Sequence, residues 1–131
     1  MIDIAPLSRF QRETGPRVLV VEDDADIAGF VRAALEDAGY DVASARHGAA
    51  GLEVADRFCP DVVLVDLRMP IMDGWSFVKQ YRARHGDGRV VLLSGVHEAR
   101  DIARQVNADA VLEKPLEIDV LIDTVARLAR G

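Results

Sequence analysis

The chain has 131 residues, with 22 acidic and 16 basic side chains and a formal net charge of −6. At roughly 100–200 residues per domain, this length predicts one domain with one core. The acidic balance argues against binding to nucleic-acid phosphates or to an anionic membrane, since both repel an anion. A single cysteine, Cys59, excludes an intrachain disulfide and a multi-cysteine zinc site. With no apolar run long enough for a signal or a membrane span, we expect a cytoplasmic protein.

Residues 1–16 contain two prolines and show no sustained hydrophobic period. We therefore expect a flexible N-terminal extension, followed by one domain over residues 17–131. The extension still carries apolar side chains able to pack elsewhere, namely Ile2, Ile4, Leu7 and Phe10.

From residue 17 onward, short apolar runs alternate with longer stretches whose apolar residues have helical spacing. Strands are expected, in chain order, at residues 18–21, 42–45, 62–65, 90–93 and 110–112. Helices are expected at residues 25–38, 48–58, 75–84, 98–106 and 116–130. Such strands are apolar on both sides, so the pattern predicts an α/β fold, a parallel sheet with five helices covering both faces. Cys59, between a helix and a strand, is expected to be partly buried.

Polar residues follow four of these strands. They are Glu22-Asp23-Asp24 after the first strand, Asp66 after the third, Ser94 after the fourth and Lys114 after the fifth. In open α/β sheets, sites form just beyond the carboxyl ends of the strands. We therefore expect these side chains to gather at one edge, with Asp24 equally suited to cap the helix that follows it.

This set of groups suits phosphoryl chemistry. Three carboxylates, Glu22, Asp23 and Asp66, repel one another unless a cation lies between them, and Mg²⁺ prefers such oxygen ligands. An ionised Asp66 is then a nucleophile toward a phosphoryl group, whose oxygens Lys114 and Ser94 would bind. The alternative is a purely structural network in which Lys114, one of only two lysines, neutralises the acids.

These residues resemble the receiver domain of two-component response regulators, as in the stand-alone chemotaxis type. The matching motifs are Val18-Leu-Val-Val-Glu-Asp-Asp24, Asp66-Leu-Arg-Met-Pro-Ile-Met-Asp-Gly74, Ser94-Gly95 and Lys114-Pro115. The resemblance implies a flavodoxin-like, doubly wound sheet of order 2-1-3-4-5. It also implies that Asp66 is the phosphoacceptor, that Lys114 contacts the phosphoryl group and that Ser94 is the switch hydroxyl. The implied Mg²⁺ ligands are Glu22, Asp23, Asp66 and the backbone carbonyl of Arg68.

The implied function is Mg²⁺-dependent phosphoryl transfer to Asp66 from a histidine kinase or a histidine phosphotransfer protein. A downstream effector protein would read the switched surface, with neither nucleic acid nor membrane as a direct partner. The chain would then be no enzyme beyond its own phosphotransfer and slow self-dephosphorylation. One departure is Val111, where the family often has an aromatic residue that couples to the switch hydroxyl. It motivates an alternative, a phosphorylation-independent receiver that serves as a docking module. An aspartate-nucleophile phosphohydrolase fits less well, because those enzymes commonly have a second Asp where this chain has Arg68.

Overall fold

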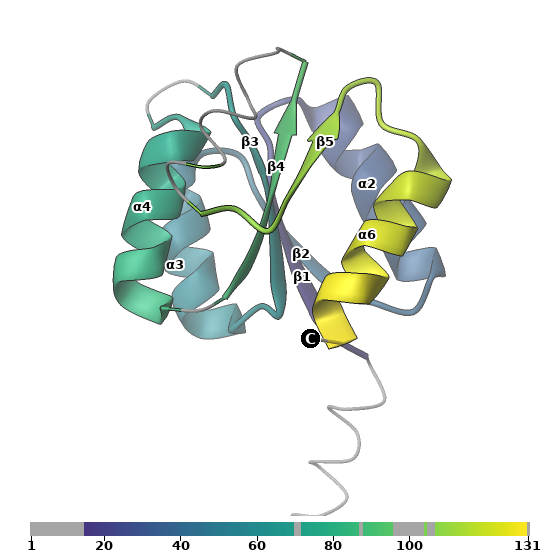
Figure 1. The fold of residues 1–131 in the computed structure, drawn as a ribbon, viewed down its shortest axis with the longest axis horizontal. Coiled ribbons are helices and arrows are strands. Elements are labelled where there is room, and N and C mark those ends of the chain that lie inside the picture. The colour runs from purple at the N-terminus through teal and green to yellow at the C-terminus, as the bar shows by residue number, and fades with distance from the viewer. Residues whose placement is uncertain (1–14, 70–71, 87, 96–103, 105–106, 131) are drawn as a thin grey trace, which may run out of the picture.

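The structure is a computed structural model that describes residues 15–69, 72–86, 88–95, 104 and 107–130. Within the described residues, strands and helices alternate from the first strand to the fourth, as the sequence predicts, and a helix follows the last strand (Figure 1). The strands are β1 (Arg17–Val21), β2 (Asp41–Ala45), β3 (Val62–Asp66), β4 (Arg89–Ser94) and β5 (Ala110–Glu113). The helices within the described residues are α2 (Ala25–Asp37), α3 (Gly48–Phe58), α4 (Gly74–His85) and α6 (Ile118–Arg130).

The strands form a parallel sheet of order β2-β1-β3-β4-β5. This order confirms the flavodoxin-like, doubly wound fold that the resemblance implies. The chain first adds β2 on one side of β1 and then β3 on the other. The carboxyl ends of β1 and β3 therefore flank the topological switch point, where this kind of sheet places its site.

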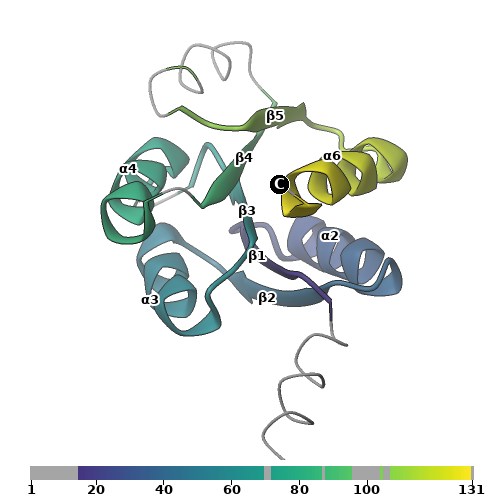
Figure 2. The ribbon, with the colours of Figure 1, turned by 60° about the horizontal axis from the view of Figure 1, so that its bottom comes forward.

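Helices cover both faces of the sheet, with α2 and α6 on one face and α3 and α4 on the other (Figures 1 and 2). Alternate residues of β1 point to the two faces. Val18 and Val20 pack in the core beneath α2 and α6, whereas Leu19 and Val21 pack beneath α3 and α4. Every residue of β3 from Val62 to Val65 is fully buried, as expected for a strand covered on both sides.

Aspartates begin two helices at the edge where the strands end. Asp24 caps α2, with its Oδ1 accepting hydrogen bonds from the backbone N–H groups of Asp26 and Ile27 at 2.9 and 3.1 Å. Asp73 caps α4 in the same way, accepting from the N–H of Ser76 at 2.8 Å. These caps fix the point at which each helix leaves the carboxyl edge of the sheet.

The structure differs from the sequence predictions in two places and leaves a third untested. The expected helix over residues 98–106 lies outside the described residues, apart from Arg104. The last helix starts at Ile118, two residues after the expected Leu116, because Leu116 packs against the core from the preceding loop. Cys59 is exposed and not partly buried, since it ends α3 in a left-handed conformation with φ of 52°.

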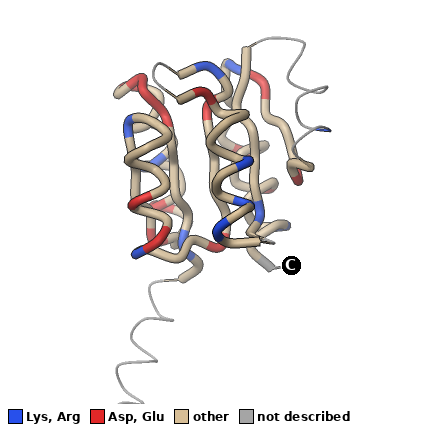
Figure 3. The backbone as a smooth tube through the Cα atoms, turned by 90° about the vertical axis from the view of Figure 1, so that its left-hand side faces the viewer, with Lys and Arg blue, Asp and Glu red and all other residues tan. Residues whose placement is uncertain are grey.

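The α3 and α4 face carries both signs of charge (Figure 3). Asp56 of α3 pairs with two residues at the end of α4, Arg84 at 2.8 Å and His85 at 2.9 Å. Exposed pairs of this kind contribute little to stability. They link the two helices at the end of the fold away from the strand carboxyl ends.

Candidate functional site

Strand register places Glu22 beside Asp66. Val21 of β1 pairs with Val65 of β3, so the residues that follow them lie at the same level of the carboxyl edge. The backbone N–H of Glu22 also donates to the carbonyl of Ala45 at 3.0 Å, which extends the pairing of β1 with β2 by one residue. Both carboxylates are buried, with 2% of Glu22 and 5% of Asp66 exposed.

The same register argument brings Lys114 to this edge. Ser94 of β4 pairs with Glu113 of β5, and the N–H of Lys114 donates to the Ser94 carbonyl at 2.9 Å. Ser94 itself is buried at the end of β4, the strand next to β3. The predicted hydroxyl and ammonium therefore follow the two strands on the far side of Asp66.

One ammonium group faces both buried carboxylates. Lys114 Nζ lies 3.1 Å from Glu22 Oε1 and 3.2 Å from Asp66 Oδ1. Backbone N–H groups bind the acids as well, that of Asp24 to Glu22 Oε2 at 3.2 Å and that of Arg68 to Asp66 Oδ1 at 3.4 Å. The ion pairs of the structural alternative are thus present, and they fix the position of Asp66.

Burial raises the pKa of Glu22 from 4.5 to about 7, against the opposing effect of its contact with Lys114. The negative charge of Asp66 adds to this rise. Burial also disfavours the charge on Lys114, but the adjacent carboxylates outweigh that effect and raise its pKa above the ordinary value. The lysine is therefore charged at neutral pH, while Glu22 is poised between its two forms.

The acidic cluster suits a hard cation. Glu22, Asp23 and Asp66 each offer a carboxylate oxygen, and these atoms lie within 4.8 Å of one another. Glu22 Oε1 is buried, and the ammonium that lies 3.1 Å from it, that of Lys114, is shared with Asp66. Asp23 is exposed and leaves the cluster open to solvent. Lys114 contacts only two of the three carboxylates, so a divalent ion bound by all three would neutralise the remaining negative charge.

Gly74 holds the loop that follows Asp66 and was missed as a site residue by the sequence analysis. Its N–H donates to the Leu67 carbonyl at 2.9 Å. A Cβ atom at this position would lie 2.5 Å from the Asp66 carbonyl oxygen and 2.8 Å from Leu67 Cα. Only glycine lets α4 begin this close to the end of β3. The Asp-Gly pair in the sequence indicated a turn, but not contact with the Asp66 backbone.

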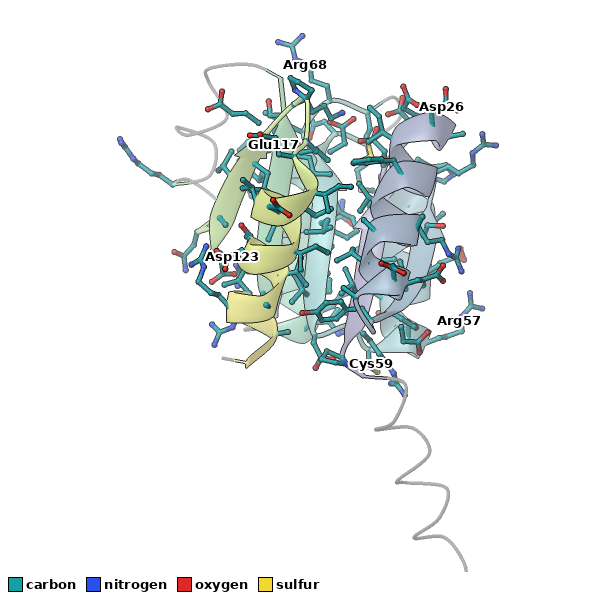
Figure 4. The ribbon with its side chains drawn as sticks, turned by 90° about the vertical axis from the view of Figure 1, so that its right-hand side faces the viewer. Asp26, Arg57, Cys59, Arg68, Glu117 and Asp123 are labelled. Atoms are coloured by element: carbon teal, nitrogen blue, oxygen red, sulfur yellow. The ribbon has the colours of Figure 1, made fainter. Side chains whose placement is uncertain are left out.

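The structure thus brings together four of the predicted residues, Glu22, Asp23, Asp66 and Lys114, and places Ser94 at the neighbouring strand end. Arg68 is exposed at the same end of the molecule, whereas Cys59 lies at the opposite end (Figure 4). Asp24 is a helix cap, which accounts for its place in the acidic run without a metal.

A doubly wound parallel sheet with an acidic cluster and a lysine at its switch point defines a class of α/β signalling domain. The chain matches the family described as the response regulator receiver domain over residues 18–126, and it belongs to that family. It is therefore a receiver domain of two-component response regulators.

Curated relatives of this chain are transcriptional regulators. The transcriptional regulatory protein PrrA of Mycobacterium tuberculosis is 37% identical over 119 residues, which cover 89% of this chain and 51% of that protein. The DNA-binding transcriptional regulator NtrC of Escherichia coli is 37% identical over 113 residues, which cover 84% of this chain and 24% of that protein. The chain thus spans about half of the first relative, and less of the second.

Solved structures of similar length share the fold. Chemotaxis protein CheY4 of Vibrio cholerae aligns with a TM-score of 0.83 and 32% identity, covering 86% of this chain and 98% of that one. The Francisella response regulator 1452 receiver domain aligns with a TM-score of 0.82 and 32% identity, covering 88% and 98%. In the part of the chain that the structure describes, no helix has the length and apolar character needed to cross a lipid bilayer.

Proposed function

We propose that this receiver accepts a phosphoryl group on Asp66 from a phosphohistidine of a histidine kinase or phosphotransfer protein, in a Mg²⁺-dependent reaction. The observation that carries the proposal is the buried Asp66 carboxylate, held 3.2 Å from Lys114 and beside Glu22 and Asp23. Its downstream partner is an effector protein in the cytoplasm, with neither nucleic acid nor membrane as a direct partner of this domain.

In the transfer step, an Asp66 carboxylate oxygen forms a bond to phosphorus while the bond from phosphorus to the donor imidazole nitrogen breaks. The electron pair of the broken bond stays on the imidazole. Lys114 balances the charge on the phosphoryl oxygens, and its contact with Asp66 Oδ1 places it on the side of the carboxylate where it is needed. Glu22, Asp23, Asp66 and the Arg68 carbonyl are the groups that would hold Mg²⁺, and the ion would supply further positive charge for the phosphoryl oxygens.

Ser94 is the group proposed to report phosphorylation to the surface. Its carbonyl accepts the N–H of Lys114 at 2.9 Å, so the strand end that carries the hydroxyl is tied to the residue that binds the phosphoryl group. A change at Asp66 is therefore transmitted to β4 and β5 through contacts that already exist. The change is one of populations, since a phosphoryl group acts by binding one arrangement more tightly than the other.

The test is incubation with acetyl phosphate and Mg²⁺, followed by measurement of the intact mass. The expected result is one added phosphoryl group on the unchanged protein and none on Asp66→Asn. The matched control is Asp37→Asn, an exposed carboxylate at the end of α2, which should gain the group like the unchanged protein. An adduct that survives in Asp66→Asn would overturn the assignment.

Val111 favours one second candidate, a docking module that works without phosphorylation. Val111 pairs with Leu92 and packs, half-buried, against the core on the α3 and α4 side, where an aromatic residue would be needed for the familiar coupling to the switch hydroxyl. Beryllofluoride, a phosphoryl mimic, distinguishes the candidates. A switching receiver shows changed amide hydrogen exchange in β4 and β5, whereas a docking module shows none beyond the site itself.

Phosphate-ester hydrolysis is not expected of this site. We expect no turnover of small phosphate esters, and only slow self-dephosphorylation of Asp66, because Arg68 stands where a phosphohydrolase commonly has its second aspartate. Release of phosphate from such esters over many turnovers would favour the enzyme reading.

A further inference from the structure

The helix α3 begins at the carboxyl edge of the sheet with a histidine cap, whereas α2 and α4 begin there with aspartates. The Nδ1 atom of His47 accepts the backbone N–H of Ala50 at 3.2 Å. His47 is half-buried, and its backbone is extended with φ of −156°, which is typical of an N-cap residue. A ring nitrogen that accepts a hydrogen bond carries no proton, so this cap requires the neutral imidazole.

The connection between β2 and α3 that contains His47 contacts two parts of the candidate site. On one side of His47, the Ala45 carbonyl accepts the N–H of Glu22 at 3.0 Å. On the other side is Gly48, the first residue of α3, which is buried. A Cβ atom on Gly48 would lie 2.6 Å from Sδ and 2.8 Å from Cγ of Met72, so the Met72 side chain lies directly against the start of α3.

Met72 comes directly before the residues that start α4. Asp73 is the cap of this helix, and the N–H of Gly74 donates to the Leu67 carbonyl at 2.9 Å. Gly74 also lies against the backbone carbonyl of Asp66. Since α3 and α4 lie side by side on one face of the sheet (Figure 2), the start of α3 supports the start of α4 through Met72.

We propose that His47 is a positioning residue for Asp66, and that protonation of its ring loosens the start of α3 and, through Met72, the loop after Asp66. Histidine is the side chain that ordinarily changes charge between about pH 5 and pH 8. In the protonated ring both nitrogens carry hydrogen, so Nδ1 no longer accepts the N–H of Ala50. The new positive charge also lies at a helix N-terminus, where the backbone N–H groups disfavour a cation.

The surroundings of His47 offer no ion pair that would keep a protonated ring in place. The elements packed against α3 are β1, β2 and α4, and α3 has no acidic residue in its first turn. The charged residues that these elements and their ends carry at the carboxyl edge are Glu22, Asp23, Arg46 and Asp73. None of them forms an ion pair with His47 within the described ranges.

His85 responds to acid in the opposite sense and provides the matched control. It ends α4, and its Nε2 lies 2.9 Å from Oδ1 of Asp56 on α3. Protonation of His85 therefore adds an ion pair between the two helices and cannot loosen them. His85→Gln should leave the response of the site to acid unchanged.

The cap is tested by amide hydrogen exchange in the full chain, without metal or phosphoryl donor, at about pH 8 and about pH 6. His47→Asn keeps a side-chain acceptor that does not titrate. At about pH 6, we expect Ala50 and Gly74 to be at least about twofold better protected in His47→Asn than in the unchanged chain, with no difference at about pH 8. In His47→Ala, the protection of Ala50 should be about fivefold lower at both pH values. Equal protection of His47→Asn and the unchanged chain at about pH 6 would overturn the proposal.

A second comparison tests the route through Met72. Met72→Ala removes the side chain that lies between the two helix starts. In this background, His47→Asn should still protect Ala50 at about pH 6 but should give no advantage at Gly74. An advantage at Gly74 that persists without the Met72 side chain would overturn this route and, with it, the positioning of Asp66 by His47.

The effect on phosphorylation rests on the proposed function and has its own readout. With acetyl phosphate and saturating Mg²⁺, His47→Asn should gain its phosphoryl group at least about twofold faster than the unchanged chain at about pH 6 and equally fast at about pH 8, since only the chain with an ordered loop is competent. Equal rates at both pH values, despite the difference in protection, would overturn the positioning of Asp66. The difference in protection with no adduct in any variant would instead overturn the proposed function and leave the acid-sensitive cap intact.

Discussion

At the scale of single residues, the site depends on a buried carboxylate that lacks full compensation. Glu22 is 2% exposed, and the ammonium of Lys114, which lies 3.1 Å from its Oε1, is shared with Asp66. Holding such a group ionised costs stability unless a cation joins it. We therefore expect the metal-free domain to be less stable when Glu22 is ionised than when it is protonated.

The first prediction concerns pH. The pKa of Glu22 is raised to about 7, so the folded state binds a proton more tightly than the unfolded state does. With a chelator present, the free energy of unfolding should fall by about 1–3 kcal/mol between about pH 5 and pH 8. The raised pKa of Lys114 acts only in the alkaline range and leaves this window unchanged.

Urea unfolding at several pH values measures this dependence. Glu22→Gln should remove most of it, and saturating Mg²⁺ should reverse it, because a metal binds the ionised carboxylate. Stability that rises with pH in the metal-free protein, or an equal slope in Glu22→Gln, would contradict the account.

The second prediction compares the two lysines. Lys114→Met leaves Glu22 and Asp66 without their ammonium, and we expect it to lower the free energy of unfolding by about 2–3 kcal/mol at about pH 8, less at about pH 5. Lys79→Met is the control, since Lys79 is exposed and its Nζ lies 4.6 Å from the centre of the Trp75 ring. It should cost less than about 1 kcal/mol. Equal losses would mean that the charge at the site has no special role.

The residues of the site could be read from the sequence because each follows a buried apolar strand. Parallel strands end at one edge, so Glu22, Asp66, Ser94 and Lys114 had to converge there. The contacts between these side chains could not be predicted from the sequence, because they depend on the strand register and on the side-chain rotamers. The structural alternative placed Lys114 among the acids, but nothing in the sequence indicated that its ammonium would lie almost equally far from Glu22 and Asp66, or that Glu22 would be more deeply buried than Asp66.

At the scale of elements, the start of α4 fixes the loop after Asp66. The third prediction is that Gly74→Ala lowers the free energy of unfolding by about 1–3 kcal/mol and slows phosphorylation, because the new Cβ would collide with backbone atoms of Asp66 and Leu67 that cannot move aside.

Gly29→Ala is the matched control. Gly29 lies inside α2, and a Cβ atom there meets nothing within 4 Å. The substitution should raise the free energy of unfolding by up to about 1 kcal/mol, since alanine is the better helix former. Unfolding curves and intact-mass kinetics on the two variants check the prediction, which fails if they behave alike.

Element ends were the least predictable part of the fold. The strands and the helices at residues 25–38, 48–58 and 75–84 could be predicted from the hydrophobic period. None of their observed ends differs from the predicted end by more than one residue. The start of α6 could not be predicted from this period. The apolar Leu116 fits the helical spacing, but it lies in the loop before the helix and packs against the core from there. The burial of Cys59 was also predicted wrongly, because this residue ends α3 in a left-handed conformation and is exposed.

At the scale of the whole molecule, the net charge of −6 has a local component. Glu22, Asp23 and Asp66 contribute three negative charges at one edge, against the one positive charge of Lys114. The strand order that creates this edge is a property of the full sheet, with β1 and β3 at its centre. The fold thus concentrates charge that the sequence distributes over residues 22–114.

The central claim is that Asp66 receives the phosphoryl group and that the acidic cluster makes this reaction depend on Mg²⁺. The most direct measurement is fragment mass spectrometry of the protein after exposure to acetyl phosphate, with Mg²⁺ or with a chelator. The account predicts a phosphoryl group on the fragment that contains Asp66, and its loss when Mg²⁺ is withheld. A phosphoryl group on any other residue, or the same yield with the chelator, would contradict it.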